Sequence, residues 1–186
     1  PLVKGALDIR EKSLGPGHLQ VAESLLSLAS LRQQQGQFKE AKDLFQRGLE
    51  MRTKALPADN PLIAEAQLGL GEIHFELTEL PQAEALYKKS LEIREKALGP
   101  DHPDVARSLM DLGWLYYNDS KFEEAERIYK RSMAILEHTL GPDHPDVANN
   151  LTSLAGLCLW TRRFAESETY YRRALAIQEK VLGPEH

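Results

Sequence analysis

Hydrophobic positions recur along the chain at the spacing of an α-helix. Between residues 19 and 35, the side chains of Leu25, Leu28 and Ala29 stand three and four residues apart, and the same column continues one turn later at Arg32. Because such positions share one face of a helix, the pattern predicts a helix with one buried stripe. The columns return near residues 61–77, 103–119 and 145–161, for example at Leu109, Leu112, Gly113 and Tyr116, and at Leu151, Leu154, Ala155 and Cys158.

A second helix is predicted after each of these segments. The four second helices begin near Phe38, Leu80, Phe122 and Phe164. A small, an aromatic and another small residue follow at helical spacing, as in Ala125, Tyr129 and Ser132. Small side chains let two helix backbones approach closely. Short turns around Gly36, Thr78, Ser120 and Arg162 should make the two helices of each pair antiparallel.

The helix pairs repeat every 42 residues. A leucine marks the same place in each copy, at Leu14, Leu56, Leu98, Leu140 and Leu182. Gly99 and Gly141 then follow a helix end, where glycine adopts a left-handed conformation at little cost. The new helices open on Pro61, Pro103 and Pro145, at a position that needs no amide hydrogen, and Asn60 is a candidate cap.

These residues resemble the tetratricopeptide repeat, a helix-turn-helix unit with a usual period of 34 residues. The third copy carries the family's order of residue types at Leu109, Leu112, Gly113, Tyr116, Ala125, Tyr129 and Ser132. The longer period of 42 is similar to that of the kinesin light chain and nephrocystin type. The resemblance implies an all-α fold, a right-handed superhelical solenoid of antiparallel helix pairs.

One array is expected to fill residues 1–186. Its expected parts are the end of a preceding second helix at 1–14, four repeats at 19–56, 61–98, 103–140 and 145–182, and the start of another loop at 183–186. The first part rests on Leu2, Val3, Ala6, Leu7 and Ile9, which match residues 42 positions later. We expect the sequence to be a piece of a longer protein.

In the family's geometry the first helices line a concave groove, and the resemblance implies that a partner binds there. The candidate binding residues stand beside the core face of each first helix: Leu26, Leu68, Glu72, Phe75, Arg107, Met110, Trp114, Tyr117, Asn118, Asn149, Thr152 and Trp160. Many are large and apolar, and an exposed apolar patch with a polar rim marks a partner site. The alternative is that some of them pack against neighbouring helices.

The first helices depart from the kinesin light chain pattern in one respect. That family often shows Leu-Asn-Asn-Leu-Ala there, and its asparagines hold the backbone of a bound peptide. The matching segment of the third copy is Leu109-Met-Asp-Leu-Gly113, and the other copies lack the asparagines as well. Recognition of motor cargo through those asparagines is therefore not expected, while peptide binding in general stays open.

Charge and composition narrow the class of partner. Lys and Arg number 23 and Asp and Glu number 28, which gives a formal net charge of −5. Because proteins that bind phosphates usually carry the opposite sign, nucleic acid is disfavoured as a partner. No segment approaches the ~20 apolar residues of a membrane span, so no membrane insertion is expected. The single cysteine, Cys158, fits a reducing, cytoplasmic location.

No group of residues indicates catalysis. His18, His102, His144 and His186 recur one full repeat apart, so they should not converge as zinc ligands, and roles in loops and caps are expected instead. The motifs of phosphate loops, serine hydrolases and zinc proteases are absent from the sequence. We expect no enzyme activity, no metal and no cofactor.

Together these patterns favour a scaffold or adaptor for protein–protein interaction. A peptide or helical segment would bind in the groove through apolar anchors, in a longer protein such as a kinesin light chain-like cargo adaptor. Two alternatives stay open. The array could be a structural or self-association module that uses its uncapped ends, or a regulatory sensor array in a larger signalling protein.

Overall fold

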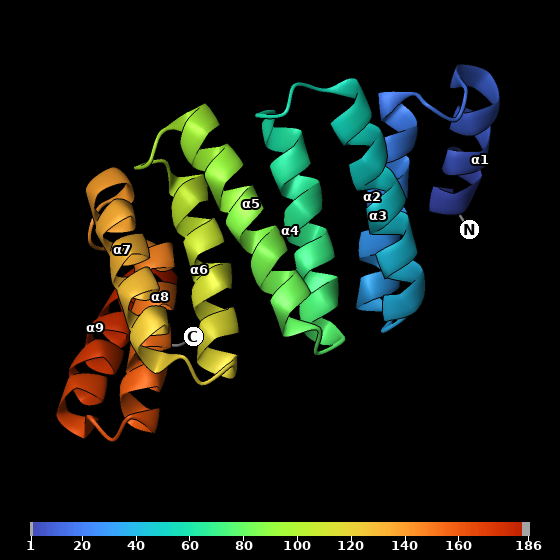
Figure 1. Ribbon diagram of the computed structural model, residues 1–186. Coiled ribbons are helices and arrows are strands. Elements are labelled where there is room, and N and C mark those ends of the chain that lie inside the picture. Colours follow the sequence, from blue (N-terminus) through green and yellow to red (C-terminus); the bar gives the residue numbers. More distant parts are fainter. Residues whose placement is uncertain (1, 184–186) are drawn as a thin grey trace. The chain divides into compact units, whose positions relative to one another are not determined.

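The computed structural model describes residues 2–183, and every regular element among them is an α-helix (Figure 1). The helices are α1 (Leu2–Leu14), α2 (Leu19–Gln34), α3 (Phe38–Ala55), α4 (Pro61–Glu76), α5 (Leu80–Leu98), α6 (Pro103–Asn118), α7 (Phe122–Leu140), α8 (Pro145–Trp160) and α9 (Phe164–Leu182). The predicted first helices are α2, α4, α6 and α8, and each ends one residue earlier than predicted. The expected all-α fold of helix pairs is confirmed. The expected loop at 184–186, with His186, lies outside the described residues.

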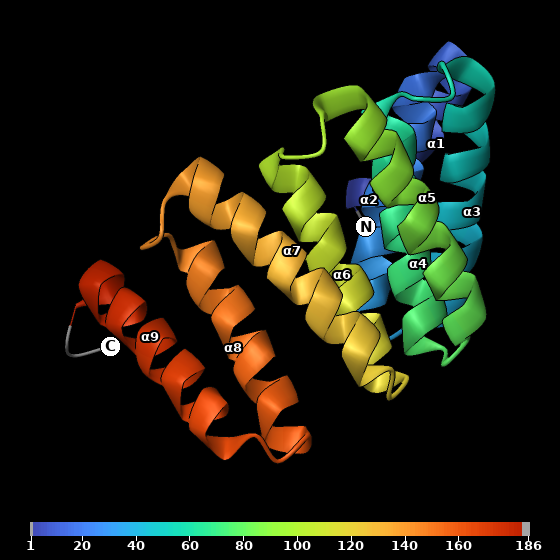
Figure 2. The same ribbon diagram turned by 60° about the vertical axis from the view of Figure 1, so that its left-hand side comes forward.

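The chain divides into two compact units, Pro1–Ala97 and Leu98–His186. The division falls at the junction between the second and third predicted repeats. Unit 1 contains the pairs α2/α3 and α4/α5 after α1, and unit 2 contains the pairs α6/α7 and α8/α9 (Figure 2). In each pair the two helices run antiparallel and side by side, as the short turns predict.

The turn inside each pair contains one residue with left-handed backbone geometry. Gly36 has φ +72°, which a glycine adopts easily, whereas Thr78, Ser120 and Arg162 have φ values of +59°, +58° and +60°. A β-branched residue is strained in this region, so Thr78 is held there by its surroundings. The same turn geometry is thus imposed on four different residue types.

The first helices begin with side-chain caps. The Nδ1 atoms of His18, His102 and His144 accept hydrogen bonds from backbone amides two residues later, over 3.1–3.2 Å. Asn60 Oδ1 accepts one from the Leu62 amide over 3.0 Å. Because a capped helix start leaves fewer unpaired amides, these residues fix where each repeat begins. The predicted cap roles of Asn60 and of the three described loop histidines are confirmed.

The helix pairs are held by the predicted apolar faces. The leucine columns at Leu109, Leu112, Leu151 and Leu154 are buried. A Cβ on Gly113 would lie 2.5 Å from Cε1 of Tyr129, so glycine lets the tyrosine ring pack directly on the backbone of α6. Cys158 is also buried, and burial raises the pKa of its thiol. The packing therefore follows the helical period of the sequence.

Candidate functional site

Unit 1 has a hollow of about 530 Å³ between its first helices α2 and α4, with α3 behind them. It is lined by Glu23, Leu26, Ser27, Ser30, Phe45, Arg52, Leu62, Glu65, Ala66, Leu68, Gly69 and Glu72. We call it the unit 1 hollow. Most of the charged groups that line it are carboxylates, and its one cation comes from the second helix α3.

That cation, Arg52, is buried, with 7% of its surface exposed. Its Nη1 atom donates to the carbonyl oxygen of Leu62 over 2.6 Å and to Oε2 of Glu65 over 2.8 Å. A buried guanidinium needs such partners, because an unpaired buried charge is strongly unfavourable. The guanidinium thus ties α3 to the start of α4 and closes one end of the unit 1 hollow.

The opposite end of the unit 1 hollow is bridged by a polar contact between α2 and α4. Gln33 Nε2 donates to Oε2 of Glu72 over 3.1 Å. Burial raises the pKa of Glu72 above its ordinary range; the hydrogen bond from Gln33 opposes this rise, and the nearby Glu76 adds to it. Unit 1 therefore presents an acidic, hydrogen-bonded surface.

Unit 2 has a hollow of about 240 Å³ in the corresponding place. We call it the unit 2 hollow; it is lined by Pro103, Arg107 and Met110 of α6, Leu136 of α7, and Asp146 and Asn149 of α8. Five of these residues stand two repeats, or 84 residues, after members of the unit 1 hollow, namely Glu23, Leu26, Arg52, Leu62 and Glu65. The two hollows thus occupy the same place in the helical frame, but Leu136 replaces the buried arginine.

An aromatic ridge continues along α6 beyond the unit 2 hollow and ends at the first residue of α7. It consists of Trp114, Tyr117 and Phe122. The rings of Trp114 and Tyr117 stack with centroids 5.5 Å apart at 18°, and Phe122 meets the edge of Tyr117 at 6.0 Å and 62°. Trp114 is nevertheless 50% exposed. Loss of solvation raises the pKa of Tyr117, to which the nearby Tyr171 also contributes.

A polar side chain next to the ridge bonds to the backbone of its own helix. Asn118 Nδ2 donates to the carbonyl oxygen of Trp114 over 2.8 Å, one turn back on the same helix. On the neighbouring helix α8, a Cβ on Gly156 would meet only the hydroxyl of Tyr171, at 3.9 Å. Gly156 thus leaves open space on α8, unlike Gly113 on α6, which is in contact with Tyr129.

A further apolar surface lies on α9 and the end of α8. It is lined by Leu159, Phe164, Ser167, Glu168, Tyr171, Arg172 and Leu175 around a hollow of about 450 Å³. Tyr171 is 42% exposed, although the sequence pattern puts it in the column of the buried residues Phe45, Tyr87 and Tyr129. The reason is that, among the described residues, no further helix follows α9 to cover this ring.

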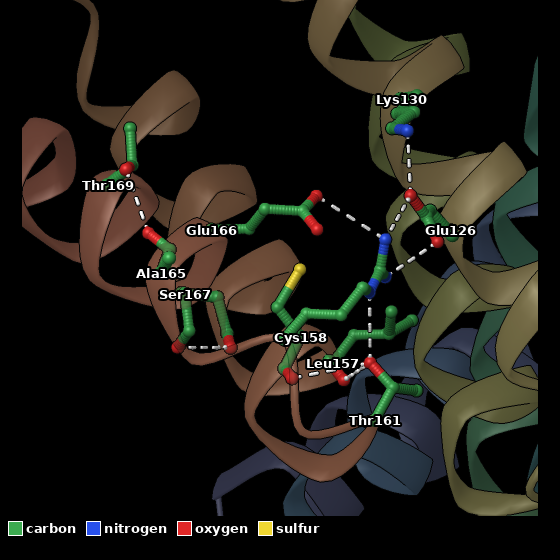
Figure 3. A network of polar contacts seen from close by, with 11 residues as sticks. Glu126, Lys130, Leu157, Cys158, Thr161, Ala165, Glu166, Ser167 and Thr169 are labelled. Atoms are coloured by element: carbon green, nitrogen blue, oxygen red, sulfur yellow. Dashed lines mark hydrogen bonds and ion pairs between the residues drawn. The ribbon is translucent and has the colours of Figure 1, made fainter.

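Ion pairs join consecutive repeats within each unit. In unit 2, Arg163 binds both oxygens of Glu126 over 2.7 and 3.1 Å, and its Nε donates to Oγ1 of Thr161 over 3.1 Å. Figure 3 shows the Glu126 carboxylate joined by a dashed line to Lys130, the Nζ atom of which lies 2.7 Å from Oε1. The hydrogen bond from Arg163 lowers the pKa of Glu126 against the opposing effect of burial. This network is structural, because every charge in it has a partner.

The structure groups the predicted binding residues into three sets. Leu26, Leu68 and Glu72 line the unit 1 hollow, although Leu26 is only 8% exposed and packs on Gly48, so its role is largely in the core. Arg107, Met110 and Asn149 line the unit 2 hollow. Trp114, Tyr117 and Asn118 belong to or support the aromatic ridge.

The other three predicted residues lie apart from these sets. Phe75 is half-buried on α4, near its end. Thr152 is exposed, and its hydroxyl donates to the carbonyl oxygen of Ala148 over 2.9 Å on its own helix. Trp160 is exposed at the last position of α8. Their role in binding therefore stays a prediction.

Sequence reasoning missed the residues that the second helices contribute. Arg52 and Leu136 reach the hollows from α3 and α7, and Asp146 stands at the start of α8. A signal for them exists in the repeat: positions 10, 52 and 94 are arginine, and position 136 is leucine. This column shows where an arginine gives way to a leucine, but not that either residue lines a hollow.

The comparisons with known proteins agree with this architecture. The family model of the tetratricopeptide repeat matches residues 1–54, 62–138 and 116–180. None of the curated proteins compared with the chain matches it. Within the described residues, the helices are too short or too polar to cross a membrane.

Solved structures show the same fold at low sequence identity. A point variant of the nearly identical TPR-like repeats of a Podosopora anserina protein named as a putative kinesin light chain matches with a TM-score of 0.84 and 24% identity, over 97% of this chain and 85% of that one. BtubC (BKLC) from P. vanneervenii matches with a TM-score of 0.79 and 23% identity, over 96% of this chain and 70% of that one. The apo form of RapI matches with a TM-score of 0.81 and 18% identity, over 95% of this chain and 63% of that one.

Proposed function

Because this chain belongs to the tetratricopeptide repeat family, whose members are generally non-catalytic scaffolds, we propose that it binds a peptide or helical segment of a partner protein. The groove lined by its first helices is the site of binding. Unit 2 supplies the apolar anchor points, and the polar groups of the neighbouring rows fix the register of the bound segment.

The aromatic ridge carries this proposal. Trp114 is half exposed yet fixed by stacking on Tyr117 at 5.5 Å. A large ring that is already ordered loses little side-chain freedom when a partner covers it. Tryptophan and tyrosine are also the residue types that most often dominate binding energy. The ridge therefore has both the chemistry and the rigidity of an interface anchor.

The space around the ridge fits an extended or helical segment. Gly156 leaves open space on α8, and Met110, which lines the unit 2 hollow, stands one turn before Trp114 on α6. A helix that binds in a groove uses anchors spaced by one turn. An apolar residue of the partner over Trp114 and a second side chain in the hollow satisfy that spacing.

A cargo adaptor of the kinesin light chain kind is the finer form of this proposal. The likeness to the solved TPR-like repeats of a kinesin light chain protein supports it at the level of fold. The partner then would be a segment of another protein, and no catalytic step is involved.

Selection from a library of random peptides displayed on phage tests the proposal. Peptides recovered on the wild-type chain should bind Trp114→Ala/Tyr117→Ala at least about tenfold more weakly, because the anchor rings are gone. Circular dichroism establishes that both proteins are folded. Phe164→Ala is the matched control, since it removes an exposed ring from α9 and leaves the ridge intact. Unchanged affinity in the double variant, or failure to recover any peptide, contradicts the proposal.

Self-association is a second candidate, favoured by the apolar surface of α9. Phe164, Tyr171 and Leu175 are exposed there around a hollow of about 450 Å³. Two copies that pair through this surface would remove these side chains from water. Sedimentation equilibrium should then show a dimer that Leu175→Glu abolishes. A monomer at all concentrations rules this candidate out without affecting the groove.

A further inference from the structure

A guanidinium group contacts the start of a first helix in both repeat junctions of unit 1. Arg10 Nη1 donates to Oγ of Ser24 over 2.6 Å and to the carbonyl oxygen of Gln20 over 3.3 Å. Arg52 Nη1 donates to the carbonyl oxygen of Leu62 over 2.6 Å. Gln20 and Leu62 stand one repeat apart, so the same carbonyl receives the cation each time. The fold therefore contains a repeated place for a guanidinium.

The junction between α7 and α8 keeps this place but lacks the arginine. Leu136 occupies the position of Arg10 and Arg52, and it is buried. Asp146 and Asn150 occupy the positions of Gln20 and Ser24, the acceptors of Arg10. The unit 2 hollow, lined by Leu136 and Asp146, is found at this junction. Unit 2 thus keeps a hollow at this place, as unit 1 does, but lacks the internal cation.

Asn150 is a buried polar residue of the same junction, although it is not among the residues that line the unit 2 hollow. Its side chain is 0% exposed, and neither Nδ2 nor Oδ1 has a hydrogen-bond partner among the described residues. The equivalent Ser24 receives Arg10. A buried amide without partners is unfavourable, so native proteins rarely keep one without a reason.

We propose that the unit 2 hollow binds an arginine side chain of the peptide partner, in the place that Arg52 fills in unit 1. This inference rests on the proposed peptide binding in the groove. The aliphatic part of the arginine lies against Met110 and Leu136. Its guanidinium faces the Asp146 backbone carbonyl and carboxylate, with the Asn149 amide beside them.

The chemistry of the lining favours arginine over other side chains. The planar guanidinium offers five donors in a fixed arrangement, which suits several oxygen acceptors at once, whereas lysine carries a compact, strongly hydrated charge. A purely apolar side chain would cover the Asp146 carboxylate without giving it a partner, which is unfavourable.

One cation on the rim needs to be accounted for. Arg107 also lines the unit 2 hollow, but its Nη1 lies 3.6 Å from Oδ1 of Asp104, and its side chain is largely exposed. Its charge is therefore partly balanced, and the side chain is free to stay in water. Asp146 has His144 Nδ1 at 3.7 Å as its neighbour, a contact that is an ion pair only when the histidine is protonated.

The peptide library provides the test. Peptides selected on the wild-type chain should be enriched in arginine at one fixed distance from their apolar anchor. Leu136→Arg puts a guanidinium of the chain itself into the hollow, where it takes the place of the peptide's arginine. The affinity for these peptides should therefore fall about tenfold or more. Leu140→Arg is the matched control: it adds the same charge one turn further along α7, at an exposed position, and should leave the affinity unchanged.

A second variant covers the case in which Leu136→Arg does not fold. Asp146→Asn removes the carboxylate but keeps the helix start, so it should lower the affinity for peptides that contain the arginine. The affinity for the same peptides with norleucine in place of arginine should not change. Selected peptides without an arginine preference, or with equal affinity for the wild type and Asp146→Asn, overturn the inference. If these peptides still depend on Trp114 and Tyr117, the proposed function stands and only the arginine site fails.

Discussion

Units 1 and 2 share one helical frame and differ in the surface they place on it. At positions 84 residues apart, unit 1 carries Ser30, Gln33, Glu72 and Phe75, and unit 2 carries Trp114, Tyr117, Gly156 and Leu159. In unit 1 a hydrogen bond from Gln33 to Glu72 bridges the first helices. In unit 2 the same places hold a stacked aromatic pair and a glycine. The difference shows that two units with the same helix packing can carry different side chains on the exposed face of their first helices.

The ion pairs between repeats show the opposite behaviour. Lys42 binds Glu79 over 2.6 Å in unit 1, and Glu126 binds Arg163 over 2.7 Å at the same two positions in unit 2. Both charges are reversed together, so the attraction is kept. The two units thus share a pair of opposite charges between consecutive repeats. Their hollows, in contrast, differ in charge and in volume.

The largest expected effect tests whether both units depend on the same frame. Leu28→Ala in unit 1 and Leu112→Ala in unit 2 remove equivalent buried leucines, and each should lower the free energy of unfolding by about 2–5 kcal/mol. Urea unfolding measures the loss, and hydrogen exchange identifies the destabilised unit. A loss near zero in either variant means that the assigned helical face is wrong.

The next prediction compares Gly113, which packs against a neighbouring helix, with Gly156, which has open space around it. Gly113→Ala should destabilise unit 2 by about 1–3 kcal/mol, because its Cβ would lie 2.5 Å from the Tyr129 ring. Gly156→Ala meets only the Tyr171 hydroxyl at 3.9 Å, so it should stabilise the helix by about 0.5–1 kcal/mol. Thermal unfolding of the two variants should shift in opposite directions. Equal shifts would contradict the distinction.

A charge swap tests the reversed ion pairs. Arg163→Glu should lower stability by about 1 kcal/mol, since it breaks a two-pronged contact and opposes Glu126. The double variant Glu126→Arg/Arg163→Glu recreates the polarity of unit 1 but should recover only part of the loss, because the exchanged charges face Lys130 and Glu166. Lys42→Glu should destabilise less, because Lys42 makes a single contact with Glu79. A double-mutant cycle without coupling refutes the equivalence of the two pairs.

The smallest effect is a pH dependence of opposite sign in the two units. The pKa of Glu72 is raised by burial, so its ionised form is unfavourable in the fold, and Glu72→Gln should raise the melting temperature at pH 7 by on the order of 1 °C. The pKa of Glu126 is lowered by Arg163, so its ionised form is favourable in the fold. Glu126→Gln should therefore lower the melting temperature at pH 7. Both differences should vanish as the pH falls well below 4.5, the ordinary glutamate value, because both carboxyls are then protonated. Differences of the same sign would contradict these assignments.

The frame could be predicted from the sequence because it depends on local spacing. The leucine columns, the histidine caps and the close approach at Gly113 all follow from helical period and turn chemistry. The hollows could not, because residues such as Arg52 and Leu136 reach them from the second helices. Tyr171 shares the buried aromatic column, yet it is exposed because burial depends on a neighbouring helix and not on spacing alone.

The central claim is that the groove of unit 2 binds the partner, and the indole signals of the two tryptophans test it most directly. The chain contains only Trp114 and Trp160, so nitrogen-15 NMR shows two indole signals, and a Trp114→Phe variant assigns them. Titration with a peptide selected on the wild-type chain should shift the Trp114 signal strongly, because the partner covers the exposed ring of the aromatic ridge. A bound peptide that leaves the Trp114 signal unchanged would contradict the account.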